Sequence, residues 1–219
     1  MKTTLKFLSQ LAKNNDKSWF DENRKLYEEA RKEYMGLIDE VILQLKKSDP
    51  AIGDQTAKTS IFRINRDVRF SKDKSPYKTN FGASINAHGR KSMMPGYYVH
   101  VEPGKSFIGG GLYMAEPAMI KKVRQEIDYN FEEFQSILKS SSFKKTYKDI
   151  YDGKDVKLSR VPQGYEKDNP AAEYLKLKSW IVMREVPDEY MTDSKASSKI
   201  VKDLEAMQPL LVFLNKALD

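Results

Sequence analysis

The sequence contains no cysteine and only two histidines, His88 and His100, among its 219 residues. Without cysteine the chain cannot form a disulfide, an iron–sulfur cluster or a thiolate zinc site, and it cannot use a cysteine nucleophile. Two histidines are too few for a His-rich metal cage or a multi-histidine relay. We therefore expect no cofactor and no dedicated metal centre.

Long apolar runs are also missing. No stretch approaches the roughly 20 apolar residues of a membrane-spanning helix. The first six residues lack the apolar run and the cleavage pattern of a secretory signal. These features predict a cytoplasmic protein with no membrane partner.

The amino-acid composition of the chain suits a folded domain. Apolar residues make up 40% of the chain and aromatic residues 11%, which is enough to bury a core, while charged residues make up 32%. The length fits one large domain, and no internal repeat or low-complexity linker divides it. We expect residues 1–219 to form a single domain.

The positive charge is concentrated in the middle of the chain. The formal net charge is +7, and residues 61–104 contain eight basic and three acidic side chains. Residues 1–60 contain eleven basic and ten acidic side chains, and residues 105–219 contain nineteen and eighteen. A basic excess is typical of polyanion binding, but its confinement to one segment favours a compact anion site over a nucleic-acid coat.

Hydrophobic periodicity predicts an α+β fold. Helical spacing of apolar residues predicts a long helix over residues 18–47 and a C-terminal helix over residues 192–218. Alternation of apolar and polar residues predicts strands at residues 61–70, 79–87, 97–102, 106–113 and 177–185. Short Gly- and Pro-containing links favour antiparallel pairing. The prediction is an antiparallel sheet of about five strands, from residues 61–113 and 177–185, packed with the N-terminal and C-terminal helices.

Three consecutive glycines, Gly109 to Gly111, lie in one of the predicted strands. Glycine weakens a strand, so such a run suggests that something approaches the backbone closely. That neighbour is either a ligand or a packed aromatic residue such as Trp180.

The segment from Arg63 to Lys78 contains six basic and two acidic residues. In a strand over residues 61–70, Arg63, Asp67 and Arg69 share one face, with roughly 6.5–7 Å per two residues. Guanidinium groups at that spacing can clamp a phosphate or a carboxylate. Structural Arg–Asp pairing is the alternative, although the carboxylates of the segment are too few to neutralise all its cations.

His100 and Glu102 share a face of the strand predicted at residues 97–102. They are interpreted as a hydrogen-bonded pair, as acid–base groups, or as two metal ligands if a third, such as Asp67, joins them. An enzyme would use His100 with Glu102 or Asp67 for proton transfer, and the arginines to stabilise negative charge.

The favoured hypothesis is a protein that binds an anionic small molecule bearing a phosphate or a carboxylate. Its predicted ligand-binding residues are Arg63, Arg66, Asp67, Arg69, Lys74, Tyr77, Lys78 and His100. The alternatives are the enzyme described above, a nucleic-acid-binding module, which the nearly neutral flanks make less favoured, and a purely structural or interaction domain. The sequence does not indicate the oligomeric state.

Several segments together resemble a known family. They are Asn15–Arg24 (N-x-K-x-W-F-x-x-N-R), Arg66–Asn80 (R-D-V-R-F-S-K-D-K-x-P-Y-K-T-N), Gly96–His100 (G-Y-Y-x-H), Gly109–Tyr113 (G-G-G-L-Y), Pro162–Tyr165 (P-x-G-Y) and Pro170. They are similar to the widespread conserved hypothetical proteins of the "domain of unknown function 2461" family. The resemblance spans about Leu5 to Leu214. It implies that the basic segment is part of the family signature, and it implies no activity.

Overall fold

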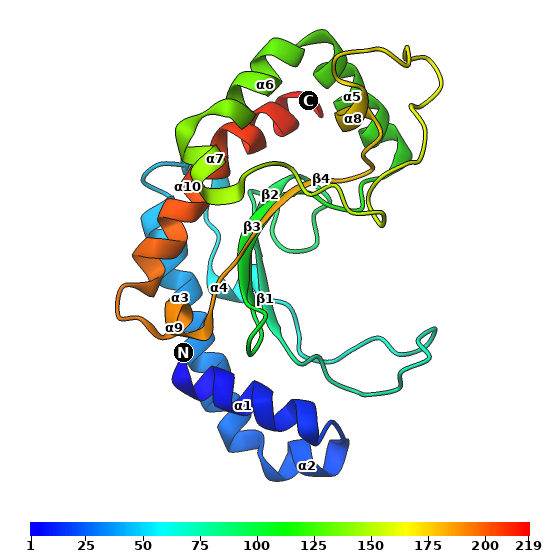
Figure 1. Ribbon diagram of the computed structural model, residues 1–219. Helices are drawn as coiled ribbons and strands as arrows, with labels where there is room; N and C mark the ends of the chain where they lie inside the picture. The colour runs from blue at the N-terminus through cyan, green and yellow to red at the C-terminus, as the bar shows by residue number, and fades with distance from the viewer. The chain divides into compact units, whose positions relative to one another are not determined.

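The computed structural model describes all 219 residues and has an α+β fold with one open antiparallel sheet (Figure 1). The strands are β1 (Phe81–Ile85), β2 (Gly96–Val101), β3 (Phe107–Leu112) and β4 (Trp180–Glu185), and they lie in the order β1-β2-β3-β4. The helices are α1 (Lys2–Lys13), α2 (Lys17–Glu22), α3 (Arg24–Leu45), the 3-10 helix η1 (Pro50–Ile52), α4 (Ala57–Ser60), α5 (Pro117–Tyr129), α6 (Phe131–Lys139), α7 (Ser141–Tyr147), α8 (Ala172–Leu175), α9 (Asp188–Thr192) and α10 (Ala196–Lys216). None of these helices combines the length and the apolar character needed to cross a membrane.

The sheet has four strands instead of the expected five, because residues 61–70 do not form a strand. This segment makes only isolated bridges, from Ile61 to Ala83 and from Asn65 to Tyr77. Its alternating apolar residues do not share a buried face, since Phe70 is 95% exposed. Without an apolar surface to cover, the alternation alone does not hold the segment in a sheet.

The long helix predicted over residues 18–47 is divided into α2 and α3 at Asn23. The Asp16 side chain accepts a hydrogen bond from the backbone of Trp19 and so begins α2. The Asn23 backbone N–H and side-chain amide both donate to the Trp19 carbonyl oxygen, at 3.0 and 2.9 Å, at the end of that helix.

The chain is organised into two compact units, each built from segments that are distant in sequence. The first unit comprises Met1–Arg90, Tyr98–Ile108 and Glu185–Lys202, and the second comprises Lys91–Tyr97, Gly109–Arg184 and Asp203–Asp219. Every ligand-binding residue predicted from the sequence lies in the first unit, which is described first.

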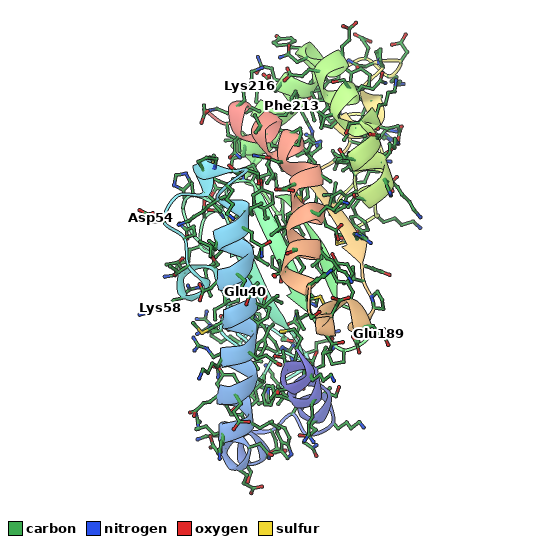
Figure 2. All side chains as sticks on the ribbon, turned by 90° about the vertical axis from the view of Figure 1, so that its left-hand side faces the viewer. Glu40, Asp54, Lys58, Glu189, Phe213 and Lys216 are labelled. Carbon is green, nitrogen blue, oxygen red and sulfur yellow. The ribbon has the colours of Figure 1, made fainter.

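Tyr34 attaches α3 to one face of the sheet in the first unit. Its side chain is buried, its ring stacks on Phe81 at 5.3 Å, and its hydroxyl donates to the Val99 carbonyl oxygen at 2.9 Å. In Figure 2, Glu40 of α3 faces the viewer and the strands lie behind the helix. The apolar side of α3 therefore packs against the sheet while its charged side faces solvent.

Successive side chains of β2 point to opposite faces of the sheet, as its sequence predicts. Val99 and Val101 are fully buried on the side where Tyr34 packs. Tyr98 points to the opposite face, since a Cβ atom at Gly82 of β1 would overlap its hydroxyl group. The opposite face of this strand also holds His100.

The second unit packs its own apolar core. Trp180, Phe134 and Phe213 are almost completely buried, and the rings of Phe134 and Phe213 lie 5.3 Å apart. The Tyr147 hydroxyl donates to the carbonyl oxygen of Asp203 at 2.7 Å, and the Asp203 carboxylate pairs with Arg184. These contacts join α7, β4 and the C-terminal part of α10.

Gly109, Gly110 and Gly111 lie where neighbouring backbone comes closest to β3. A Cβ atom at Gly109 or Gly111 would overlap a carbonyl oxygen of β4, and one at Gly110 would overlap the carbonyl oxygen of Gly96. Gly110 and Gly111 also have positive φ angles of 150° and 119°. The close approach expected from the sequence is therefore made by the adjacent strands.

We expect Gly111→Ala to lower the free energy of unfolding by about 3 kcal/mol, because the added methyl group meets backbone at a φ that alanine adopts poorly. As a control, Gly36→Ala on α3 meets no atom within 4 Å. It should raise the free energy of unfolding by about 0.5–1 kcal/mol. Urea denaturation followed by circular dichroism measures both changes. A Gly111→Ala protein as stable as the wild type would contradict the packing described.

Candidate functional site

Arg66 holds together the loop that occupies the place of the expected first strand. Its guanidinium donates to Asp73 Oδ2 at 2.6 Å, to the Ser75 carbonyl oxygen at 3.0 Å and to Ser71 Oγ at 3.3 Å. Hydrogen bonds from Ser75, followed by the contact with Arg66, lower the pKa of Asp73 to about 2. Arg66 thus braces the segment 66–75, which we call the braced loop.

Arg69 and Asp67 form a bidentate pair within the braced loop. Arg69 Nε lies 3.0 Å from Asp67 Oδ1, and Arg69 Nη2 lies 2.7 Å from Asp67 Oδ2. This pairing lowers the pKa of Asp67 and raises the pKa of Arg69. Both side chains are exposed, so the pair adds little to stability, but each already has a partner of opposite charge.

The tip of the braced loop presents Phe70 to solvent. Its ring is 95% exposed, and the Arg69 guanidinium carbon lies 5.8 Å from the ring centroid. Lys74 Nζ donates to the Val68 carbonyl oxygen at 3.0 Å across the base of this turn. The loop is therefore ordered by its own charged side chains.

Tyr77 anchors the chain after the braced loop. Its buried ring stacks on Phe20 of α2 at 4.0 Å with an interplanar angle of 15°. Its N–H donates to Asn15 Oδ1 at 3.1 Å, and its carbonyl oxygen accepts from Asn15 Nδ2 at 3.0 Å. These contacts bring Asn15, Phe20 and Tyr77 together, and they give Tyr77 a packing role.

Arg63 and Lys78 have no carboxylate partner. Neither side chain makes an ion pair or a hydrogen bond, and the carboxylate whose charge interacts with Arg63, Asp67, is held by Arg69. Lys78 is half-buried, with its Nζ 5.4 Å from the centroid of the Phe62 ring. Burial, and then the positive charge of Arg63, lower the pKa of Lys78. The positive charge of Arg63 therefore disfavours the charged form of Lys78.

Protein groups surround the side chain of His100. Its Nε2 is 3.2 Å from Glu102 Oε2, and Asn80 Nδ2 is 3.2–3.3 Å from both ring nitrogens. The imidazole stacks on Phe107 at 4.5 Å, and the Tyr98 hydroxyl is 3.5 Å from Nδ1. Burial lowers the pKa of His100, against an opposing effect of Glu102. The imidazole is therefore neutral near pH 7.

The His100–Glu102 contact is the hydrogen-bonded pair that the sequence allowed. Glu102 is also held by Thr79, whose hydroxyl donates to Oε1 at 3.0 Å. Both imidazole nitrogens have protein neighbours, so neither is open to a substrate, and His100 is only 8% exposed. Proton transfer by His100 would first require these contacts to open.

Sequence reasoning missed an aromatic strip beside these groups, formed by Phe62, Tyr98 and Phe107. The ring centroids of Phe62 and Tyr98 are 6.4 Å apart, and those of Tyr98 and Phe107 are 5.6 Å apart. All three side chains are half-buried. Two signals in the sequence could have identified the strip. Tyr98 shares a strand face with His100, and the adjacent strand has a glycine, Gly82.

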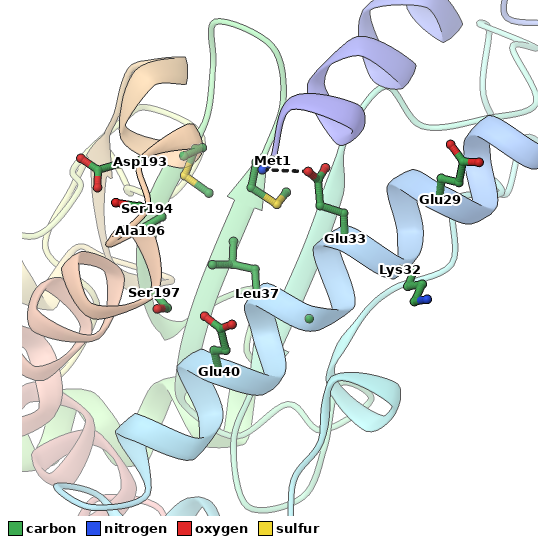
Figure 3. Close-up of a pocket in the computed structure, with 12 residues that line it drawn as sticks. Met1, Glu29, Lys32, Glu33, Leu37, Glu40, Asp193, Ser194, Ala196 and Ser197 are labelled. Atoms are coloured by element: carbon green, nitrogen blue, oxygen red, sulfur yellow. Dashed lines mark ion pairs between the residues drawn. The ribbon is translucent and has the colours of Figure 1, made fainter.

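A separate hollow of the first unit lies away from these residues. A cavity of about 470 Å³ is bounded by Glu29, Glu33 and Glu40 of α3 and by Asp193 after α9 (Figure 3). The Met1 ammonium group closes one side through an ion pair of 3.0 Å with Glu33. None of the predicted ligand-binding residues lines this cavity. Its acidic lining is unsuited to an anion, so it is not the site predicted from the basic segment.

Asp67 pairs with Arg69, so it is not a ligand that joins His100 and Glu102. No group of three or more His, Asp or Glu side chains is arranged to hold a metal ion.

Comparison with known families identifies a match over most of the sequence. The model of a conserved hypothetical protein family, DUF2461, matches residues 3–213. The chain belongs to this family. The matched range of the DUF2461 protein contains Arg63, Lys78, His100 and the aromatic strip. No curated protein and no solved structure matches the chain.

We expect the imidazole of His100 to titrate below about pH 6.5, the ordinary pKa of histidine, because burial disfavours its charged form. The unfolded chain then binds the proton more readily than the folded protein, so stability is complete above about pH 6.5 and falls as the pH drops below it. NMR titration of the His100 ring measures this pKa directly. The loss of stability between about pH 6.5 and 5 should be smaller in His100→Gln than in the wild type. A His100 ring that titrates above about pH 6.5 would overturn this account.

Proposed function

We propose that this DUF2461 protein binds an anionic small molecule through Arg63 and Lys78. The observation that carries the proposal is a pair of neighbouring cations that lacks a carboxylate partner and of which one is half-buried. A partly buried charge is unfavourable unless an opposite charge compensates it. A phosphate or carboxylate bound between the two side chains would supply that compensation.

The basic residues of the segment differ in their contacts, and this difference supports the choice of Arg63 and Lys78. Arg66, Arg69 and Lys74 are occupied by contacts within the braced loop. Arg63 retains its whole guanidinium for bidentate contact with an anion. Lys78 adds a second positive charge, and a bound anion would relieve the repulsion between them.

The alternative functions are less well supported. An enzyme based on His100 would need an open ring nitrogen, and a nucleic-acid module would need a longer stripe of unpaired cations. A structural role agrees with the pairing of Arg66 and Arg69, but it leaves the half-buried Lys78 with only the Phe62 ring as a partner. The cytoplasmic location stays a prediction from the sequence.

We expect Arg63→Gln and Lys78→Gln each to weaken the binding of inorganic phosphate at least tenfold, which corresponds to about 1.4 kcal/mol. Isothermal titration calorimetry at constant ionic strength measures the dissociation constant without a change in charge screening. The thermal melting temperature should rise with phosphate in the wild type and not in these variants.

Lys72→Gln is the matched control, because Lys72 is an exposed cation of the same segment with no ion pair. It removes the same charge and should leave phosphate binding within about twofold of the wild type, since exposed charges are strongly screened. No binding of phosphate, sulfate or citrate by the wild type would refute the proposal. So would an equal loss of affinity in Lys72→Gln and Lys78→Gln.

A further inference from the structure

Lys78, one of the two unpaired cations, lies at one end of the aromatic strip. Lys78 Nζ is 5.4 Å from the Phe62 ring centroid, and the strip continues from Phe62 to Tyr98 and Phe107. The His100 imidazole stacks on Phe107 at the other end. Charge and aromatic surface are thus continuous on one face of the first unit.

This face is opposite the one that α3 covers (Figure 1). Tyr98 follows Tyr97 and precedes Val99, both of which are buried, yet its own side chain is half-buried. The absence of a side chain at Gly82 lets the Tyr98 ring lie across β1, where a Cβ atom would overlap its hydroxyl group. Part of an aromatic surface therefore remains accessible on a sheet whose other face is a core.

A hydrogen-bond acceptor beside the strip is also available to a ligand. Asn80 directs its amide nitrogen at the His100 ring, while its amide oxygen accepts no hydrogen bond. An acceptor next to an aromatic surface suits the exocyclic amine or ring N–H at the edge of a heterocycle. The cations suit a phosphate, and the rings suit a planar group that stacks on them.

We propose that the ligand of this face combines a phosphate with a planar heterocycle, as a nucleoside monophosphate does. The phosphate lies between Arg63 and Lys78, and the heterocycle stacks on the Tyr98 and Phe107 side of the strip. This inference rests on the proposed function, since it assigns the chemical class of the anion bound there.

A mononucleotide fits better than a single-stranded nucleic acid. Aromatic residues on a sheet also bind single strands, but those surfaces add cations that follow several phosphates. Here the remaining basic side chains of the segment, apart from the exposed Lys72, are held within the braced loop. The charge is sufficient for one phosphate group.

The test compares inorganic phosphate, ribose 5-phosphate, adenosine monophosphate and uridine monophosphate by isothermal titration calorimetry at constant ionic strength. We expect at least one of the two nucleotides to bind at least tenfold more tightly than ribose 5-phosphate. Tyr98→Leu should reduce the affinity for that nucleotide to the affinity for ribose 5-phosphate. It should leave the affinity for inorganic phosphate unchanged. Tyr98→Phe, which keeps the ring, should retain nucleotide binding. Phe70→Leu removes an exposed ring outside the strip and should have no effect.

The outcomes separate this inference from the proposed function. If phosphate, ribose 5-phosphate and both nucleotides bind equally, and all are lost in Lys78→Gln, the anion site stands and the heterocycle inference fails. If none of the four binds, and sulfate and citrate do not bind either, both fail. If an eight-nucleotide single strand binds more than tenfold more tightly than either mononucleotide, with a steep dependence on salt, the mononucleotide assignment is overturned in favour of nucleic acid. A Tyr98→Leu protein that keeps wild-type nucleotide affinity and a native circular dichroism spectrum also overturns it.

Discussion

The opposite orientation of successive side chains along β2 is the constraint on which the rest of the first unit depends. Val99 and Val101 are directed into the core, where Tyr34 of α3 packs and donates to the Val99 carbonyl oxygen. The intervening residues Tyr98 and His100 are consequently directed to the other face. One strand therefore stabilises the fold and presents the candidate site, and a shift of one residue in its register would exchange the two roles.

Some cations of the basic segment pair with carboxylates and stabilise its loop, and the others remain unpaired. Arg66 and Arg69 are neutralised by Asp73 and Asp67, and these contacts shape a loop that has no regular secondary structure. A segment with more cations than carboxylates cannot pair all of them. The residues left over are Arg63 and Lys78 near the sheet, Lys72 on the loop, and Lys74, whose ammonium group donates to the Val68 carbonyl oxygen. The net charge of +7 is thus less informative than the positions of the few unpaired cations.

Local patterns in the sequence predict the fold well where burial follows the pattern. The α+β class, the alternation of β2 and the family resemblance are confirmed. The strand expected at residues 61–70 is wrong, because alternation does not reveal whether an apolar surface exists to bury Phe70. The pairing of Arg66 with Asp73 depends on how the loop folds back, which spacing along the chain does not specify. The aromatic strip was missed for a related reason, since Phe62, Tyr98 and Phe107 meet only after three segments come together.

The glycine run of β3 has a consequence for the order in which the chain folds. Glycine loses more backbone freedom than any other residue when it becomes ordered, and β3 orders Gly109, Gly110 and Gly111 in succession. The partner β4 begins only at Trp180, so the pairing that compensates this loss must first close the long stretch of chain after Leu112. Contacts so distant in sequence form slowly. We therefore expect the junction of β3 and β4 to form after the hairpin of β1 and β2, whose strands are much closer in sequence.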